Sequence, residues 1–199
     1  ISNENELNKV GGNKNFEIPE FMKNETLIEI WSTSNEQLIW VTENRIALLN
    51  LPNENENFSI QYEHIHINKI TSATIGTSLW QDSANEQKLL VIGDNQGNVF
   101  SWNLNSNNKT NLTKENRMHL DNGFFTGPIK SVLLANYNGV YQDELFILDS
   151  ENFRMFRSSK VIEEINLSSE NLASTKIVLS NSSDNSIDSV IFLQSNNEW

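Results

Sequence analysis

The stretch Lys88–Leu104, KLLVIGDNQGNVFSWNL, carries the clearest structural pattern in this chain. Lys88–Gly93 is a mainly apolar run with β-branched residues, and Asn98–Leu104 alternates between two faces with the period of a strand. Asp94–Gly97 lies between them as a turn, in which Gly97 is free to take the positive φ of a tight reversal. The stretch therefore predicts a β-hairpin.

Weaker copies of this pattern recur along the rest of the chain. Strand-like runs begin near residues 27, 70, 129 and 174, at intervals of about 43, 59 and 45 residues. A period of about 40–45 residues with four short strands per unit is typical of propeller blades. The longer middle interval is explained by an insertion at Asn105–Asn122. Since no segment has a sustained helical period, the sequence predicts an all-β fold.

The sequence also predicts how the chain is divided. Residues 1–26 are expected to form a flexible lead-in, in which Asn15–Phe21 could add a short edge strand. Residues 27–199 are expected to form blades over 27–66, 67–122 and 127–168 and a partial blade over 172–199. The expected strands are Leu27–Trp31, Gln37–Thr42, Arg45–Leu51, Phe58–Tyr62, Ile70–Ile75, the two arms of Lys88–Leu104, Arg117–Leu120, Ile129–Ala135, Glu144–Asp149, Phe153–Arg157, Val161–Ile165, Ser174–Leu179 and Ile187–Leu193.

The net charge and the composition of the chain disfavour several classes of binding partner and site. The 199 residues carry a formal net charge of −12, which repels phosphate backbones and anionic membrane surfaces. The chain has no cysteine, which excludes disulfides, zinc-thiolate sites and cysteine nucleophiles and fits a reducing compartment. Asparagine makes up about one residue in six, mostly in loops, where it tolerates turn conformations. We therefore expect an acidic, asparagine-rich intracellular protein, of the cytoplasm or nucleus, without direct nucleic-acid or membrane contact.

The middle unit carries a recognisable set of positions. His66 precedes the strand expected at Ile70 by a short spacer, and Trp102 and Asn103 end the third strand. These positions resemble the Gly-His start and the Trp-Asp end of a blade in the WD-repeat β-propeller family. In that family the His, a strand-two Ser or Thr, a turn Asp and the Trp share one set of hydrogen bonds. The resemblance implies structural roles for His66, Trp102 and Asn103.

The unit departs from the family pattern at two positions. Ile92 stands in place of the Ser or Thr, and Gln96 in place of the turn Asp. In the first and third units, Leu49-Asn50 and Phe156-Arg157 stand where Trp-Asp would. The resemblance therefore implies a diverged propeller, over residues 27–193, that relies on apolar inner strands. Burial would contribute about 2 kcal/mol for each of Leu89, Leu90, Val91, Leu133, Phe146, Ile147 and Ile191.

The number of units is low for this architecture. Three full units and half of a fourth are fewer blades than most propellers have, and an open stack would expose sheet edges. We expect the chain to be part of a larger propeller, because Trp199 comes where the next strand of the fourth blade should begin. The alternatives are completion by the strand expected at Asn15–Phe21 or by a partner chain.

The sequence predicts no catalytic or metal site and no cofactor. His64 and His66 lie on the same side of an extended segment, but the remaining histidine, His119, is far along the chain, so a third metal ligand is missing. No phosphate-binding loop or nucleophile elbow is present. The acids nearest to turns are scattered and do not indicate a catalytic set; they are Glu43, Asp94, Asp143 and Glu151.

Loop aromatics are the candidate partner contacts. Trp80, Phe124 and Phe125 lie between expected strands, at the propeller faces where partners dock, although each could instead pack against a neighbouring blade. From these observations we predict a non-enzymatic scaffold for protein–protein contacts in an intracellular multi-subunit complex. One alternative is an enzyme or ligand-binding propeller that uses its central channel. Another is a propeller subunit of a nucleic-acid-associated assembly, of the transcription or nuclear-pore type.

Overall fold

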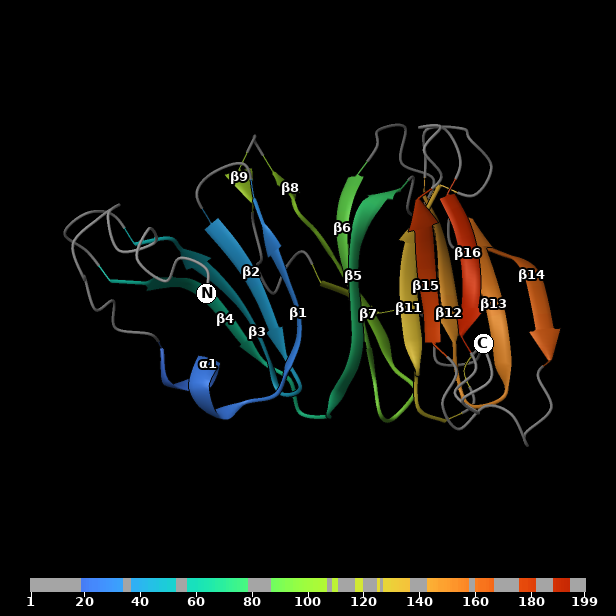
Figure 1. The fold of residues 1–199 in the computed structure, drawn as a ribbon, viewed down its shortest axis with the longest axis horizontal. Helices are drawn as coiled ribbons and strands as arrows, with labels where there is room; N and C mark the ends of the chain where they lie inside the picture. Colours follow the sequence, from blue (N-terminus) through green and yellow to red (C-terminus); the bar gives the residue numbers. More distant parts are fainter. Residues whose placement is uncertain are drawn as a thin grey trace, which may run out of the picture.

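The chain folds into antiparallel β-sheets that follow one another along the sequence (Figure 1). The computed structural model describes residues 19–33, 37–52, 57–78, 87–106, 109–110, 117–119, 125, 127–136, 143–157, 160–166, 176–181 and 188–193. The elements are α1 (Glu20–Asn24), β1 (Leu27–Ser32), β2 (Gln37–Thr42), β3 (Arg45–Asn50), β4 (Ser59–Ile65), β5 (Ile70–Ser78), β6 (Gln87–Asp94), β7 (Val99–Asn103), β8 (Asn105–Ser106), β9 (Lys109–Thr110), β10 (Arg117–His119), β11 (Ser131–Ala135), β12 (Glu144–Leu148), β13 (Asn152–Arg157), β14 (Lys160–Asn166), β15 (Lys176–Asn181) and β16 (Asp188–Leu193). The prediction of an all-β fold is confirmed.

Three of the sheets have four strands each in sequence order. Sheet one is β1-β2-β3-β4, sheet two is β5-β6-β7-β10, and sheet three is β11-β12-β13-β14. Sheet four consists of β15 and β16, and β8 pairs with β9 in a small separate hairpin between β7 and β10. Neighbouring strands of each sheet follow one another along the chain, except that the β8-β9 hairpin lies between β7 and β10, and each pair is antiparallel. The insertion after the middle hairpin therefore contributes the outer strand of sheet two.

The hairpin predicted for Lys88–Leu104 is confirmed. Its arms are β6 and β7, paired in register from Leu89 opposite Asn103 to Gly93 opposite Val99. Gly97 has a φ of 84° in the turn, as its position in the sequence predicts. Added atoms would not fit there, because a Cβ on Gly97 would lie 2.6 Å from the carbonyl oxygen of Gly127.

The lead-in differs from the prediction where it is described. Glu20 and Phe21 lie in the one-turn helix α1, and the rest of the strand expected at Asn15–Phe21 falls mostly outside the described residues. The side chain of Phe21 is buried against Ala47 and Leu49 of sheet one. This contact explains the helix, since five residues alone are too few to be stable in water.

The sheets stack face to face with their first strands together. Strands β1, β5, β11 and β15 lie near the middle of Figure 1, whereas β4 and β14 lie at its two outer sides. Both faces of sheet two are buried, since Leu90 and Ile92 pack toward sheet one and Leu89 and Val91 toward sheet three. Strands with a sheet on each side read as continuous apolar runs, as β6 does.

The burial expected from the sequence is largely present. Leu89, Leu90, Val91, Phe146 and Ile147 are each 2% exposed or less. The side chain of Leu133 is only half-buried, beside the cluster that holds Phe146, and that of Ile191 lies outside the described part of the chain.

Polar groups join the first strands of sheets two and three. The backbone N–H of Val132 donates to Ser72 Oγ at 3.0 Å, and that of Leu134 donates to Thr74 Oγ1 at 3.3 Å. A Cβ on Gly76 would lie 2.5 Å from Leu134 Cβ, so the strands approach too closely there for a side chain. The hydroxyls of β5 thus satisfy N–H groups on the edge of β11 that no strand pairs with.

Candidate interaction surface

The turns that follow the second strand of each four-stranded sheet gather at one end of the stack, along the lower edge of Figure 1. The connections that lead into β5 and β11 lie at the same end. We call this end the turn face. It comprises Glu43-Asn44, His66–Lys69, Asn95–Asn98, Gly127–Lys130 and Ser150-Glu151.

The same device holds the turn of each four-stranded sheet. Thr42, Asp94 and Asp149 occupy the equivalent position at the end of the second strand, and each is completely buried. Thr42 Oγ1 accepts from the backbone N–H two residues on at 3.3 Å. Asp94 Oδ1 accepts from the N–H groups two and four residues on at 2.9 and 2.8 Å, and Asp149 Oδ1 from those two and three residues on at 2.8 and 2.7 Å. Such local bonds favour turns over continued strand.

Asp94 also joins sheet two to the connection that leaves sheet one. Its Oδ2 accepts hydrogen bonds from His66 Nε2 at 3.1 Å, Asn68 Nδ2 at 2.9 Å and Asn98 Nδ2 at 2.8 Å. Burial raises the pKa of Asp94, but the hydrogen bonds from Asn68, Asn98 and His66 outweigh it and hold the pKa below its ordinary value. The carboxylate is therefore a stable, ionised acceptor in the interior.

Backbone hydrogen bonds fix the same connection from both sides. The N–H of His66 donates to the carbonyl of Asn44 at 2.8 Å, and the N–H of Asn95 donates to the carbonyl of Lys69 at 2.9 Å. The N–H of Ile129 in turn donates to the carbonyl of Asp94 at 2.9 Å. Successive sheets are therefore tied together along the turn face.

Only some of the side chains at the positions that resemble a WD-repeat blade form the hydrogen bonds expected from that resemblance. The carboxylate that meets His66 comes from Asp94, so the assignment of Gln96 to the turn-Asp position was wrong. The signal that could have found Asp94 is an aspartate that directly ends an apolar strand before a turn. Trp102 is completely buried, but its Nε1 has no hydrogen-bond partner among the described residues. Asn103 lies half-buried opposite Leu89.

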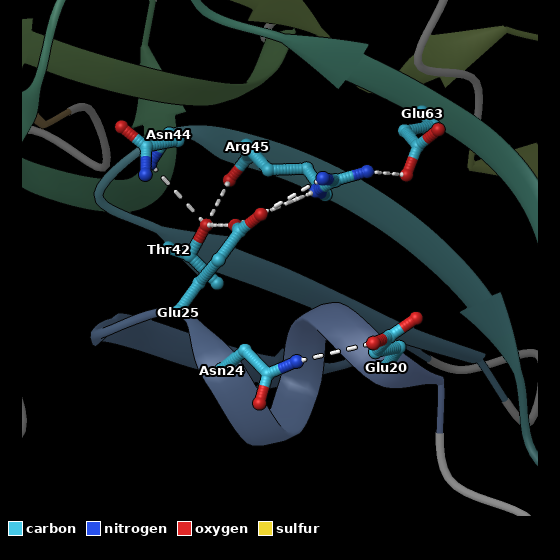
Figure 2. Close-up of polar contacts among 7 residues, drawn as sticks. All are labelled: Glu20, Asn24, Glu25, Thr42, Asn44, Arg45 and Glu63. Carbon is cyan, nitrogen blue, oxygen red and sulfur yellow. Dashed lines mark hydrogen bonds and ion pairs between the residues drawn. The ribbon is translucent and has the colours of Figure 1, made fainter.

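In sheet one, Thr42 stands where the other two sheets have an aspartate. A carboxylate from outside the sheet lies beside it and supplies the acidic group (Figure 2). Glu25, which follows α1, accepts from Thr42 Oγ1 and from Arg45, whose Nη2 lies 2.8 Å from Glu25 Oε1. Arg45 also pairs with Glu63 on β4. Burial raises the pKa of Glu25, but the bonds from Arg45 and Thr42 outweigh it and leave the pKa lowered.

In sheet three the partner of the turn aspartate is an arginine. Asp149 Oδ2 lies 2.6 Å from Arg154 Nη1, and Arg154 Nη2 lies 3.0 Å from Glu164 Oε1. The predicted partner-contact residue Phe125 lies beside this pair, with its ring centre 5.9 Å from the guanidinium carbon of Arg154 and 6.0 Å from the ring centre of Phe156. Phe125 is half-buried, whereas Trp80 and Phe124 lie outside the described residues.

An apolar tip projects from the turn face. Ile67 is 99% exposed and Ile65, at the end of β4, is 63% exposed. The residues on either side of Ile67, His66 and Asn68, are both bonded to the buried carboxylate of Asp94. Sequence reasoning placed Ile67 in the spacer before the strand at Ile70, and no local pattern there indicates an exposed apolar side chain. Ile67 is thus an exposed apolar side chain on a firmly held connection.

The described groups hold no cluster of three His, Cys, Asp or Glu side chains that could bind a metal ion. His64 Nε2 lies 3.5 Å from His66 Nδ1, and the other ring nitrogen of His66 faces Asp94. Glu43 pairs with Lys69 at 2.6 Å, and Asp143 accepts from the N–H of Thr77 at the opposite end of β5. Each of these acids therefore has a local structural partner.

Comparisons with known proteins give no family. No protein family model and no curated protein matches the chain. Among solved structures, the chain is similar to a chain in a structure of ctPRC2, with a TM-score of 0.42 and 12% sequence identity. The match covers 66% of this chain and 27% of that one, so this chain spans just over a quarter of its length. At this TM-score the similarity carries no argument about fold or function. In the part of the chain that the structure describes, no helix is long and apolar enough to cross a membrane.

Proposed function

We propose that this chain is part of a diverged β-propeller that binds a protein subunit through the turn face. The order of strands within each sheet and the adjacency of β1, β5, β11 and β15 support the propeller. The role is that of a non-enzymatic scaffold in an intracellular multi-subunit assembly. The observation that carries it is Ile67, fully exposed on a connection that buried hydrogen bonds hold in place.

The tip has the properties of an interface anchor. Burial of a fully exposed isoleucine contributes about 1.5–3 kcal/mol. Little conformational entropy is lost on binding, because the backbone around Ile67 is already fixed by Asp94 and by the turn of sheet one. Ile65 lies two residues away and extends the apolar area. Binding residues on loops held by a rigid scaffold are a common arrangement.

The net charge of the chain indicates which residues would surround the binding pocket on the partner. With a net charge of −12, the chain favours protein surfaces that carry basic residues around an apolar pocket. Such a partner would approach faster at low ionic strength, because the long-range attraction is screened by salt.

The test is a comparative capture experiment. We expect proteins that the wild-type chain captures from extract of its source cells to be lost with Ile67→Asp and retained with Ile165→Asp. Ile165 is a matched control, since it is 41% exposed on the outer strand β14. Circular dichroism would verify that both variants are folded. Equal capture by the wild type and Ile67→Asp, or equal loss in both variants, would contradict the proposal.

A further inference from the structure

His64 and His66 turn their ring nitrogens toward each other where β4 leaves sheet one. The Nε2 atom of His64 lies 3.5 Å from Nδ1 of His66. That separation exceeds the range of about 2.7–3.2 Å that N–H hydrogen bonds usually span. Two nitrogens that bind one Zn²⁺ tetrahedrally at about 2.0–2.1 Å lie about 3.3–3.4 Å apart. The two imidazoles are therefore spaced like a pair of ligands to one metal ion.

The buried carboxylate of Asp94 fixes which nitrogen of His66 carries the proton. Asp94 Oδ2 lies 3.1 Å from His66 Nε2, and the pKa of Asp94 is lowered, so the carboxylate is ionised and can only accept hydrogen bonds. His66 therefore donates from Nε2, and its neutral ring keeps a lone pair on Nδ1, the atom that faces His64. A carboxylate that accepts from the far nitrogen of a histidine is the usual companion of a metal ligand, because it orients the ring and raises its basicity.

Aromatic side chains of β7 hold both imidazole rings in place. The ring centre of His64 lies 5.6 Å from that of Trp102, and the ring centre of His66 lies 5.2 Å from that of Phe100 with the rings edge to face. His66 is only 7% exposed, whereas His64 is half-buried on the outer strand of sheet one, where water reaches it. The two ligands are thus ordered before an ion arrives, and one side of the pair stays open to solvent.

We propose that His64 and His66 bind one divalent transition-metal ion of the class of Zn²⁺ and Cu²⁺, with water in the remaining coordination positions. These ions favour imidazole nitrogen, whereas Mg²⁺ and Ca²⁺ take oxygen ligands. On binding, the contact between the two nitrogens is replaced by a bond from each nitrogen to the ion, and His64 keeps its own proton on Nδ1. With two protein ligands the site is open, unlike a structural zinc site with four.

The equivalent turn of sheet three provides a control within the same chain. Asp149 is also completely buried and accepts from the backbone N–H groups of its turn, but its Oδ2 meets Arg154 Nη1 at 2.6 Å rather than a histidine. Asp149→Asn thus removes a buried turn carboxylate without a change beside the histidine pair. Asp94→Asn removes the partner of His66 as well, so the two variants separate a role in metal binding from a role in the turn.

Calorimetric titration of Zn²⁺ into the purified chain, in the presence of excess Mg²⁺, tests the proposal. The Mg²⁺ occupies carboxylates that a net charge of −12 offers to any divalent ion. We expect a single Zn²⁺ site whose dissociation constant rises about tenfold or more in His64→Phe, which keeps a ring beside Trp102 but no nitrogen, and in His64→Leu. Asp94→Asn should raise the dissociation constant about 10–100-fold, and Asp149→Asn should leave it unchanged.

A second measurement separates loss of the site from loss of folding. Zn²⁺ should raise the urea midpoint of the wild type and of Asp149→Asn but not that of His64→Phe, because an ion that binds only the folded state stabilises it. Circular dichroism without metal checks that each variant is folded. Absence of Zn²⁺ binding in excess Mg²⁺, or binding by both His64 variants as tight as by the wild type, would overturn the proposal. Equal weakening in Asp94→Asn and Asp149→Asn would also overturn it. So would binding that replacement of the remaining histidine, His119→Phe, removes and His64→Phe retains.

Discussion

Replacement of Asp94 by asparagine tests the buried carboxylate that holds the turn face. In Asp94→Asn the amide oxygen can still accept from the two backbone N–H groups of the turn, but an NH₂ group then faces the donors of His66 and Asn68. Each hydrogen bond to a charged group contributes about 1.5–3 kcal/mol, and removing a buried charge recovers part of this. We expect the free energy of unfolding to fall by about 2–4 kcal/mol.

Urea unfolding followed by tryptophan fluorescence measures this loss. Gln96→Ala is the control, because the exposed Gln96 contributes only its backbone N–H to the cluster, and it should change the free energy of unfolding by less than about 0.5 kcal/mol. If Asp94→Asn unfolds at the same urea concentration as the wild type, the carboxylate does not hold the turn face.

The contribution of Asp94 to the free energy of unfolding should also depend on pH. The pKa of Asp94 is lowered in the folded chain, whereas an unfolded aspartate titrates near about 3.9. The unfolded state therefore binds more protons between the folded and unfolded pKa values, and the stability that Asp94 contributes is lost as the pH falls through that window. The stability difference between wild type and Asp94→Asn should be full above about pH 5 and shrink below about pH 4. A difference that is constant from neutral to acidic pH would refute the reasoning.

Two further substitutions test the packing of the stack. Gly76→Ala should lower the free energy of unfolding by about 1–3 kcal/mol, because a Cβ there would lie 2.5 Å from Leu134 Cβ; an equal urea midpoint would contradict the close approach of β5 and β11. Trp102→Ala should cost about 3–5 kcal/mol, and Trp102→Phe much less, because the indole Nε1 has no hydrogen-bond partner among the described residues. Thermal or urea unfolding measures the stability of both Trp102 variants. Similar losses of stability in Trp102→Ala and Trp102→Phe would indicate that the indole nitrogen matters.

Strand positions were predictable because local pattern and tertiary burial agree in this chain. The strand Gln37–Thr42 was predicted to the residue, and most other strand boundaries differ by one to three residues. Apolar runs with β-branched residues form strands, and Asp, Asn and Gly between them form turns. Helix α1 was not predictable, since its stability comes from the contact of Phe21 with sheet one rather than from its own five residues.

The contacts of the turn face join residues that are far apart in the sequence, so no local pattern indicates them. His66 and Asp94 are 28 residues apart, and only the stacking of sheets one and two brings them together. The family pattern was matched at Gln96, inside the predicted turn, although Asp94 at the start of the same turn is the residue that meets His66. The exposure of Ile67 was likewise hidden, because an isoleucine beside a strand is usually buried.

The two hydroxyls that β5 presents to β11 also set how the sheets are aligned with each other. Ser72 and Thr74 are two residues apart, which matches the spacing of the N–H groups that they accept from on Val132 and Leu134. A slip of one residue would place Ala73 opposite these groups and leave them without an acceptor. The hydroxyl pair therefore determines the level at which sheet three stands beside sheet two, and with it whether their turns end on one common surface.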